Sequence, residues 1–267
     1  MTNQAGGAGK TTSAVNIAAC AAEFGHEVLV VGTDAQCDAS VLLGYDTDEL
    51  DNTATLHDVL IEAASIQDAI VPASAGPVGE EDSRQIPNLY LVPESAELED
   101  AEQILTRRLA REMWLRNTLA PIRYKWDLII IDCPGNLGLV SVNAIAAADE
   151  VVACVKPGAK ELRAMTRMEA KVDQINTAFA ANGAKAELSH VLLVDVPTTR
   201  SQGAVYADSA EQAREAYGAM VLPSVRRSPR IAEAYSYQMP MSYYDRTAPV
   251  TADFYAVTKA LGITRRR

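Results

Sequence analysis

Three glycines followed by a lysine and two threonines form the clearest chemical signal in this chain of 267 residues. The segment reads, in order, Gly6, Gly7, Ala8, Gly9, Lys10, Thr11 and Thr12. Glycines let the backbone turn so that several N–H groups face one anion, and a following helix adds partial positive charge. Lys10 could reach the β- and γ-phosphates of a nucleotide, and Thr11 could ligate Mg²⁺. Glycines alone would fit a flexible tail equally well, so the residues after them favour phosphate binding.

Two aspartates come shortly after aliphatic runs of the kind that form buried strands. Two residues separate Asp34 from the run Val28–Val31, and Asp132 follows Leu128–Ile131 directly. In a parallel sheet both would lie at the carboxyl edge, where ligands bind. One carboxylate could hold the Mg²⁺ shell and the other could orient an attacking water. Either residue alone could be a turn or cap residue, whereas the pair points to a site.

Aliphatic runs alternate with longer helical patterns along the chain, which predicts a doubly wound α/β fold with a mostly parallel sheet. The other predicted strands are Leu89–Val92, Val151–Val155, Val191–Val194 and a weaker run at Ala219–Leu222. The predicted helices are Lys10–Phe24, Leu56–Ala63, Leu98–Leu119, Leu139–Ala147, Leu162–Ala180, Ser201–Tyr217 and Ala252–Leu261. The stretch Val71–Ile86, rich in Pro, Gly, Ser and acid, is interpreted as a surface loop.

Residues 1–267 are predicted to form one domain, since α/β folds of this length often do. A phosphate-binding loop normally follows a buried strand, but Met1–Asn3 is too short and polar to be one. Either the sheet lacks that strand or the chain as given begins late. The net charge of −11 excludes a uniformly basic nucleic-acid coat, although a local basic patch remains open. With four unpaired cysteines and no long apolar run, we expect a cytoplasmic protein.

The glycine loop and the helix after it resemble the deviant Walker A box of ParA/MinD-type ATPases. Residues 28–40 and 126–138 resemble the family's aspartate-rich and Walker B segments. The resemblance implies a P-loop NTPase fold that binds ATP and Mg²⁺. Lys10 and Asp34 would be catalytic, Thr11 and Asp132 would hold the metal, and Gly6–Thr12 would bind the nucleotide. Several positions depart from the family; among them, its signature lysine falls on Ala5, and Gly32 replaces the first aspartate of the aspartate-rich segment.

A late segment, residues 222–244, also resembles ParA proteins and carries several arginines. Ser228 occupies a position that lies near the adenine in the family. The family's arginines here are implied in nonspecific DNA binding, which assigns Arg227 and Arg230, with Arg200 from a neighbouring loop. A solvated charged face is the alternative that the charge run alone supports.

The sequence therefore favours a ParA-like ATPase with slow turnover that dimerises with ATP and binds DNA nonspecifically. A ParB-type adaptor would stimulate hydrolysis, and the output would be plasmid or chromosome partitioning by a nucleoid-associated protein. One alternative is a regulator or scaffold that binds nucleotide or DNA without turnover. Another is a MinD-like membrane-positioning ATPase, with Phe254, Val257, Leu261 and Ile263 as an anchoring stripe. A last helix packed on the fold explains that stripe better, so we do not favour a membrane partner.

Overall fold

The computed structural model describes residues 1–2, 7, 9–46, 53–199 and 204–266. Its strands are β1 (Val28–Gly32), β2 (Val71–Ala75), β3 (Arg84–Val92), β4 (Leu128–Asp132), β5 (Glu150–Val155) and β6 (Glu187–Leu193). The helices of the first half are α1 (Lys10–Glu23), α2 (Asp38–Leu42), α3 (Leu56–Leu60), α4 (Ala101–Thr106), α5 (Trp114–Leu119) and α6 (Leu139–Ala147). Those of the second half are α7 (Ala159–Phe179), α8 (Ala204–Tyr217), α9 (Arg230–Ser236), α10 (Met241–Tyr244) and α11 (Pro249–Ala260).

The strands form two sheets side by side, a four-stranded one in the order β2-β3-β1-β4 and the pair β5-β6. All neighbours are parallel except β2, which pairs antiparallel with β3 at the edge. In the register of β1 with its neighbours, Val31 lies beside Val92 of β3, and Gly32 lies beside Asp132 of β4. The carboxyl ends of β1, β3 and β4 therefore meet at one edge of the sheet, as predicted for the two aspartates.

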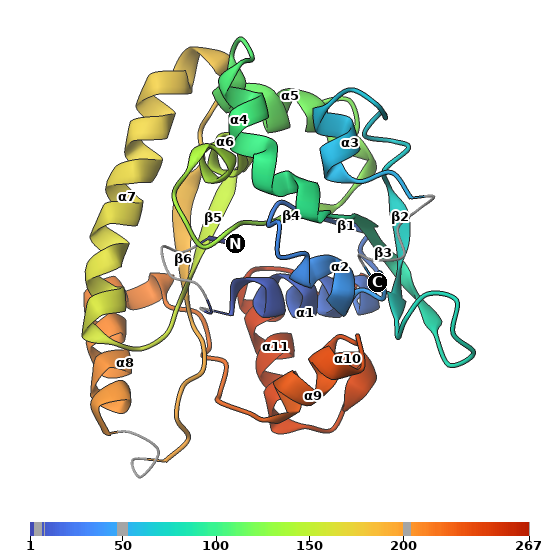
Figure 1. Cartoon of the computed structure of the whole chain (residues 1–267). Coiled ribbons are helices and arrows are strands. Elements are labelled where there is room, and N and C mark those ends of the chain that lie inside the picture. Colours follow the sequence, from blue (N-terminus) through green and yellow to red (C-terminus); the bar gives the residue numbers. More distant parts are fainter. Residues whose placement is uncertain (3–6, 8, 47–52, 200–203, 267) are drawn as a thin grey trace.

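Helices cover both faces of the sheet, which confirms the doubly wound prediction (Figure 1). Successive side chains of β1 point to opposite faces: Val28 and Val30 pack against α1, while Leu29 and Val31 pack into the cluster under α3, α4 and α5. Helix α1 is buried along most of its length because α11 covers its outer side. A helix apolar on all sides suits such a place between a sheet and a second helix layer.

Residues 1–2 lie between β4 and β5, where the strand that normally precedes a phosphate-binding loop would run. The Met1 backbone nitrogen donates to the Ile131 carbonyl at 2.8 Å, and Thr2 forms an isolated parallel bridge with Ala153. A cavity of about 580 Å³ lies between the two sheets. Met1 and Thr2 line it together with Leu128 of β4 and Val152 of β5. Residues 1–2 thus bridge the two sheets, and helices α1 and α6 pack against residues of both.

Three local predictions were wrong. The expected loop Val71–Ile86 contains β2 and the start of β3; its proline content misled because edge strands tolerate proline. The expected long helix Leu98–Leu119 is broken into α4 and α5, since Ala110 adopts a φ of +50° and the Asn143 side chain accepts a hydrogen bond from Leu115 N–H at 3.1 Å. The weak run Ala219–Leu222 is a 3₁₀ turn followed by a single bridge from Val221 to Val191.

Candidate functional site

The described part of the glycine loop has the backbone geometry of an anion cradle. Gly7 and Gly9 both have a φ of +68°, which only glycine adopts easily, and a Cβ at Gly9 would press on Val194. Helix α1 begins directly after Gly9 with no side-chain cap and no acidic residue in its first turn. A helix start of this kind suits an anionic ligand, because the first N–H groups of a helix and its dipole favour negative charge. Lys10, the first residue of α1, is buried beside this opening.

The first turn of α1 is joined to the end of β4 by one short hydrogen bond. The Thr11 hydroxyl donates to Oδ2 of Asp132 at 2.6 Å. Asp132 is fully buried, and its other oxygen, Oδ1, has no hydrogen-bond partner among the described residues. The structure thus brings together the two residues predicted to hold a metal, although they are 121 positions apart in the chain.

Asp34 lies two residues beyond the end of β1, in the turn that leads into α2. Its Oδ1 accepts a hydrogen bond from the Gln36 N–H at 3.1 Å, and its carbonyl accepts one from Cys37 at 3.0 Å. The preceding Thr33 is fixed to β4, because its hydroxyl donates to the Asp132 carbonyl at 2.6 Å. Asp34 is therefore tethered next to Asp132, and its half-buried carboxylate can still be reached by water.

A third carboxylate at this edge of the sheet was missed in the sequence. Glu94 follows β3 by two residues and is fully buried. Its Oε2 accepts hydrogen bonds from the N–H, at 2.9 Å, and from the hydroxyl of Ser40 in α2. Its Oε1 has no hydrogen-bond partner in the part of the chain that the structure describes. The available signal was indirect, since Gly32 lacks the family's carboxylate and a neighbouring strand end could supply another.

Burial shifts the ionisation of both fully buried carboxylates. It raises the pKa of Glu94 to about 8, with a further rise from the nearby charge of Asp132. It raises the pKa of Asp132 to about 6, although the hydrogen bond from Thr11 acts in the opposite direction. A cation would oppose both shifts by favouring the charged forms.

The donor set fits Mg²⁺, which prefers carboxylate and hydroxyl oxygens and is usually held by one or two carboxylates together with phosphates. The Thr11 hydroxyl and the free oxygen of Asp132 provide such donors beside the glycine loop. No group of three or more His, Cys, Asp or Glu side chains suited to a metal occurs among the described residues. A cation at this place would therefore take its remaining ligands from phosphate oxygens and water.

The arginines predicted to bind DNA are held in ion pairs. The Arg227 guanidinium lies 2.9 Å from Oδ1 of Asp195, and its neighbour Arg226 binds Asp253 at 2.6 and 2.7 Å. Arg227 also lies over the ring of Tyr206, 5.8 Å from its centroid. Arg200 lies outside the described residues, as do Gly6, Ala8 and Ala5.

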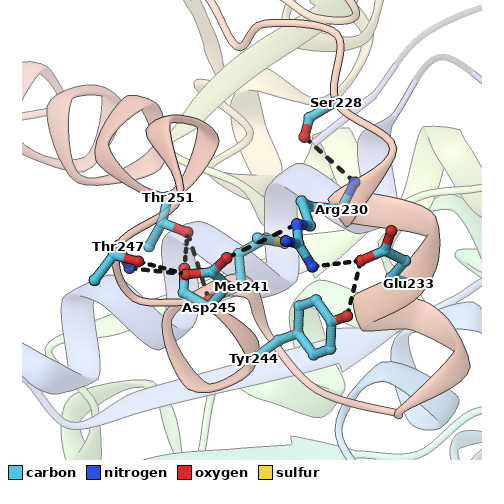
Figure 2. A network of polar contacts seen from close by, with 8 residues as sticks. All are labelled: Ser228, Arg230, Glu233, Met241, Tyr244, Asp245, Thr247 and Thr251. Carbon is cyan, nitrogen blue, oxygen red and sulfur yellow. Dashed lines mark hydrogen bonds and ion pairs between the residues drawn. The ribbon is translucent and has the colours of Figure 1, made fainter.

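The Arg230 side chain belongs to a polar network at the junction of α9 and α10 (Figure 2). It donates to Oε2 of Glu233 at 2.9 Å and lies 3.9 Å from Oδ2 of Asp245. Tyr244 donates to the same Glu233 oxygen, and both partners keep the pKa of Glu233 below its usual range. Ser228, predicted near the adenine, accepts a hydrogen bond from the Arg230 N–H at 3.3 Å and so helps to start α9.

The stripe weighed as a membrane anchor is packed inside the molecule. Phe254 and Val257 are fully buried in the core that α11 shares with α1, and Leu261 and Ile263 pack against it. None of the described helices has both the length and the apolar character needed to span a membrane.

Comparison with known proteins decides the family. Residues 1–185 match the family described as an AAA domain. The sporulation initiation inhibitor protein Soj of Bacillus subtilis is 31% identical over 252 residues, which cover 92% of this chain and 90% of Soj. The chromosome partitioning protein ParA of Myxococcus xanthus is 30% identical over 246 residues, covering 92% of this chain and 80% of that protein. The chain belongs to the ParA/MinD family of ATPases.

Solved structures agree with the fold of a ParA/MinD ATPase. The ATP complex of a McdA variant from Cyanothece superposes with a TM-score of 0.80 and covers 100% of this chain and 96% of its own, at 21% identity. The septum site-determining protein MinD of Pyrococcus horikoshii, solved with Mg-ADP, has a TM-score of 0.72, 23% identity and coverage of 97% and 93%. The predicted P-loop NTPase fold is thereby confirmed.

Proposed function

We propose that this chain binds ATP with Mg²⁺ and hydrolyses it to ADP and phosphate. The observation that carries the proposal is the 2.6 Å hydrogen bond between Thr11 and Asp132, which joins the start of α1 to the end of β4. It places a hydroxyl and a buried carboxylate beside an uncapped helix start that follows two glycines with positive φ. The nucleotides bound to McdA and MinD, as their names state, support the same conclusion.

The backbone and side chains of the site would have separate roles in binding and hydrolysing ATP. The N–H groups at the start of α1 and of the glycine loop, Gly6–Thr12, would bind the phosphates, and Lys10 would offset their charge. Thr11 and Asp132 would hold Mg²⁺, which neutralises charge on the β- and γ-phosphates when bound. Asp34, tethered at the end of β1, would orient the attacking water. Ser228, just before the start of α9, would lie near the adenine.

We further propose that ATP favours a homodimer that binds DNA nonspecifically and that hydrolysis releases it. The names of the relatives, which describe chromosome partitioning, support a role in moving plasmid or chromosomal DNA with a ParB-type adaptor. Arg227 and Arg230 are exposed and lie on the segment between β6 and α10, with Arg200 nearby in sequence. Because Arg227 and Arg230 each already have an acidic partner, DNA would have to compete with Asp195 and Glu233 for them. Nucleoid association in the cytoplasm would follow from this binding.

The test measures nucleotide and DNA binding on one preparation. Calorimetry with Mg-ATP should show binding by the wild type, and Lys10→Ala should weaken it strongly. DNA retention is then measured with ATP, with ADP and without nucleotide, for the wild type, for Arg227→Ala and for Arg107→Ala. Arg107 is an exposed arginine at the end of α4 on the opposite face of the sheet, so its loss serves as the matched control.

Retention that depends on ATP and falls only in Arg227→Ala would support the proposal. Equal retention in all three nucleotide states would contradict the switch. If the wild type with DNA and adaptor released phosphate no faster than Lys10→Ala, the chain would be a binding module without turnover. The specific observation that favours this second candidate is Ala5 at the position of the family's signature lysine.

A further inference from the structure

We infer that Glu94 takes over the role of the side chain that Gly32 lacks, as the second carboxylate at the Mg²⁺ end of the phosphate pocket. This inference rests on the proposed function and identifies a further residue for the same site. It assigns to Glu94 two tasks, which are to fix the turn that contains Asp34 and to lie beside Asp132 as a second acceptor for the hydrated cation.

The first argument is the place that Glu94 occupies. A Cβ built on Gly32 would overlap the carboxyl group of Glu94, since Cδ, Oε1 and Cγ all lie within the space that a side chain would need. A side chain at position 32 would therefore require the Glu94 carboxyl group to move. The carboxylate that the family takes from β1 is supplied here from the end of β3, into the same volume.

The second argument is that this volume lies next to Asp132. Gly32 and Asp132 are direct partners in the register of β1 and β4, so side chains at the two positions point to the same face of the sheet. Asp132 contacts Thr11 of α1 on that face. A carboxylate that fills the side-chain place of Gly32 is thus adjacent to Asp132 and on the side of the phosphate loop.

The third argument is the state of the two side chains. Glu94 and Asp132 are both fully buried, and each has one oxygen without a hydrogen-bond partner among the described residues. Buried carboxylate oxygens without partners are costly, and two of them close together are more so. Oxygens of this kind are acceptors suited to a hydrated divalent cation, which would offset their charge.

The link to Asp34 runs through α2. Cys37, which precedes α2, adopts a φ of +58° and gives no side-chain cap. Oε2 of Glu94 takes that place by accepting the Ser40 N–H at 2.9 Å, and the Glu94 N–H donates back to the Ser40 hydroxyl at 3.0 Å. Removing Glu94 would therefore release the end of the turn that begins at Asp34, which makes Glu94 a positioning residue.

The test removes the carboxylate at position 94, adds one at position 32, and then combines the two changes. Glu94→Ala, Gly32→Asp and the double variant are compared in the full chain, with Glu97→Ala as the control because Glu97 is an exposed acid three residues away. The readouts are the melting temperature without ligands and the ATP affinity by calorimetry with and without Mg²⁺. Glu94→Ala should lose about 10- to 100-fold of the increase in affinity that Mg²⁺ provides, the range typical of residues behind a metal ligand. Gly32→Asp should lower the melting temperature because its side chain collides with Glu94.

The double variant should recover both quantities, since the aspartate then fills the space that the glutamate left. Glu94→Gln is the milder probe should Glu94→Ala fail to fold. It keeps the shape and can still accept from Ser40, so the ligand-free protein should melt no lower than the wild type while the Mg²⁺-dependent increase in affinity falls. A role in folding alone would lower the melting temperature and leave that increase intact.

The inference is wrong if Glu94→Gln keeps the full Mg²⁺-dependent increase in affinity, or if a folded double variant binds no better than Glu94→Ala. Failure of the proposed function would look different, because the wild type itself would then bind no Mg-ATP.

Discussion

The phosphate end of the site and the arginine segment around α9 differ in the burial and pairing of their charged side chains. At the carboxyl edge of the sheet, Asp132 and Glu94 are fully buried and each keeps one oxygen without a partner among the described residues. Around α9, Arg227 and Arg230 are exposed, yet both are already paired with acidic side chains. The carboxylates of the phosphate end thus have oxygens available for a ligand, whereas the arginines around α9 already have their charge balanced by acidic side chains.

This difference shows where binding energy can come from. A buried carboxylate oxygen with no partner is costly, so a cation that reaches it is bound strongly. An exposed ion pair contributes about 0–1 kcal/mol and can be exchanged for a phosphate contact at little cost. The nucleotide end should therefore respond steeply to mutation, while the arginine segment should respond weakly and mainly through salt. Four predictions test this contrast.

The largest effect is expected from Asp34→Ala. Loss of the residue that orients the attacking water should reduce phosphate release by about 100-fold or more, the usual range for such a group. ATP affinity should change little, because the turn is also held through Thr33 and Ser40. Steady-state phosphate release and calorimetry measure the two quantities, with Asp82→Ala in the exposed hairpin as the control. A fall in affinity that matches the fall in rate would show that Asp34 binds nucleotide instead.

The second largest effect is expected from Thr11→Val, which removes a hydroxyl and leaves the shape of the side chain nearly unchanged. Oδ2 of Asp132 would then lose its donor inside the protein, which should lower the free energy of unfolding by about 1–3 kcal/mol. Urea unfolding of the ligand-free protein measures this change. Thr106→Val, which removes an exposed helix hydroxyl bonded to the Glu102 carbonyl, should have almost no effect. Equal losses in the two variants would remove the special status of the Thr11–Asp132 contact.

The pH dependence of stability should reveal the buried Glu94. Its pKa is about 8 in the folded protein and lower in the unfolded chain, so the folded state binds the extra proton between these values. The contribution of Glu94 to stability should therefore be fully present below its unfolded pKa and decrease as the pH rises to about 8, by at most about 1.4 kcal/mol per pH unit for one proton. Glu94→Gln should flatten this part of the curve. Identical curves for both proteins as the pH approaches 8 would rule out the buried carboxyl as the cause.

The smallest effects are expected from Asp195→Asn and Glu233→Gln, which remove the nearest acidic partner of Arg227 and of Arg230. Stability should change by less than about 1 kcal/mol. DNA retention with ATP should increase and depend more steeply on salt, by about 0.9 in the log–log slope for each additional phosphate that an arginine neutralises. Glu99→Gln, an equal charge change in the exposed turn before α4, provides the comparison. Variants that only match this control would mean that the two arginines do not contact DNA.

Much of the fold could be predicted from the sequence because local signals agreed with the global arrangement. Consecutive aliphatic runs predicted β1, β4 and β5 almost to the residue, since strands covered on both faces need apolar side chains on both. Strand β2 and the first part of β3 were missed because their prolines and glycines look like a loop and are tolerated at an edge. The break before α5 was missed because its cause, the side chain of Asn143, comes from another helix.

The glycine loop, Asp34 and Asp132 were predicted one by one, because residue type and local spacing identify them, whereas Glu94 was missed. Their mutual contacts were beyond the sequence: Thr11 meets Asp132 across 121 positions, and Glu94 fills the space above Gly32 from the next strand. Tertiary structure decided that Arg227 is paired with Asp195 and that Asp245 lies near Arg230, whereas the Arg230–Glu233 pair is local, three residues apart in α9. Sequence determines what each residue can do chemically, whereas the packing of strands and helices determines which charges become neighbours and which oxygens are left for a ligand.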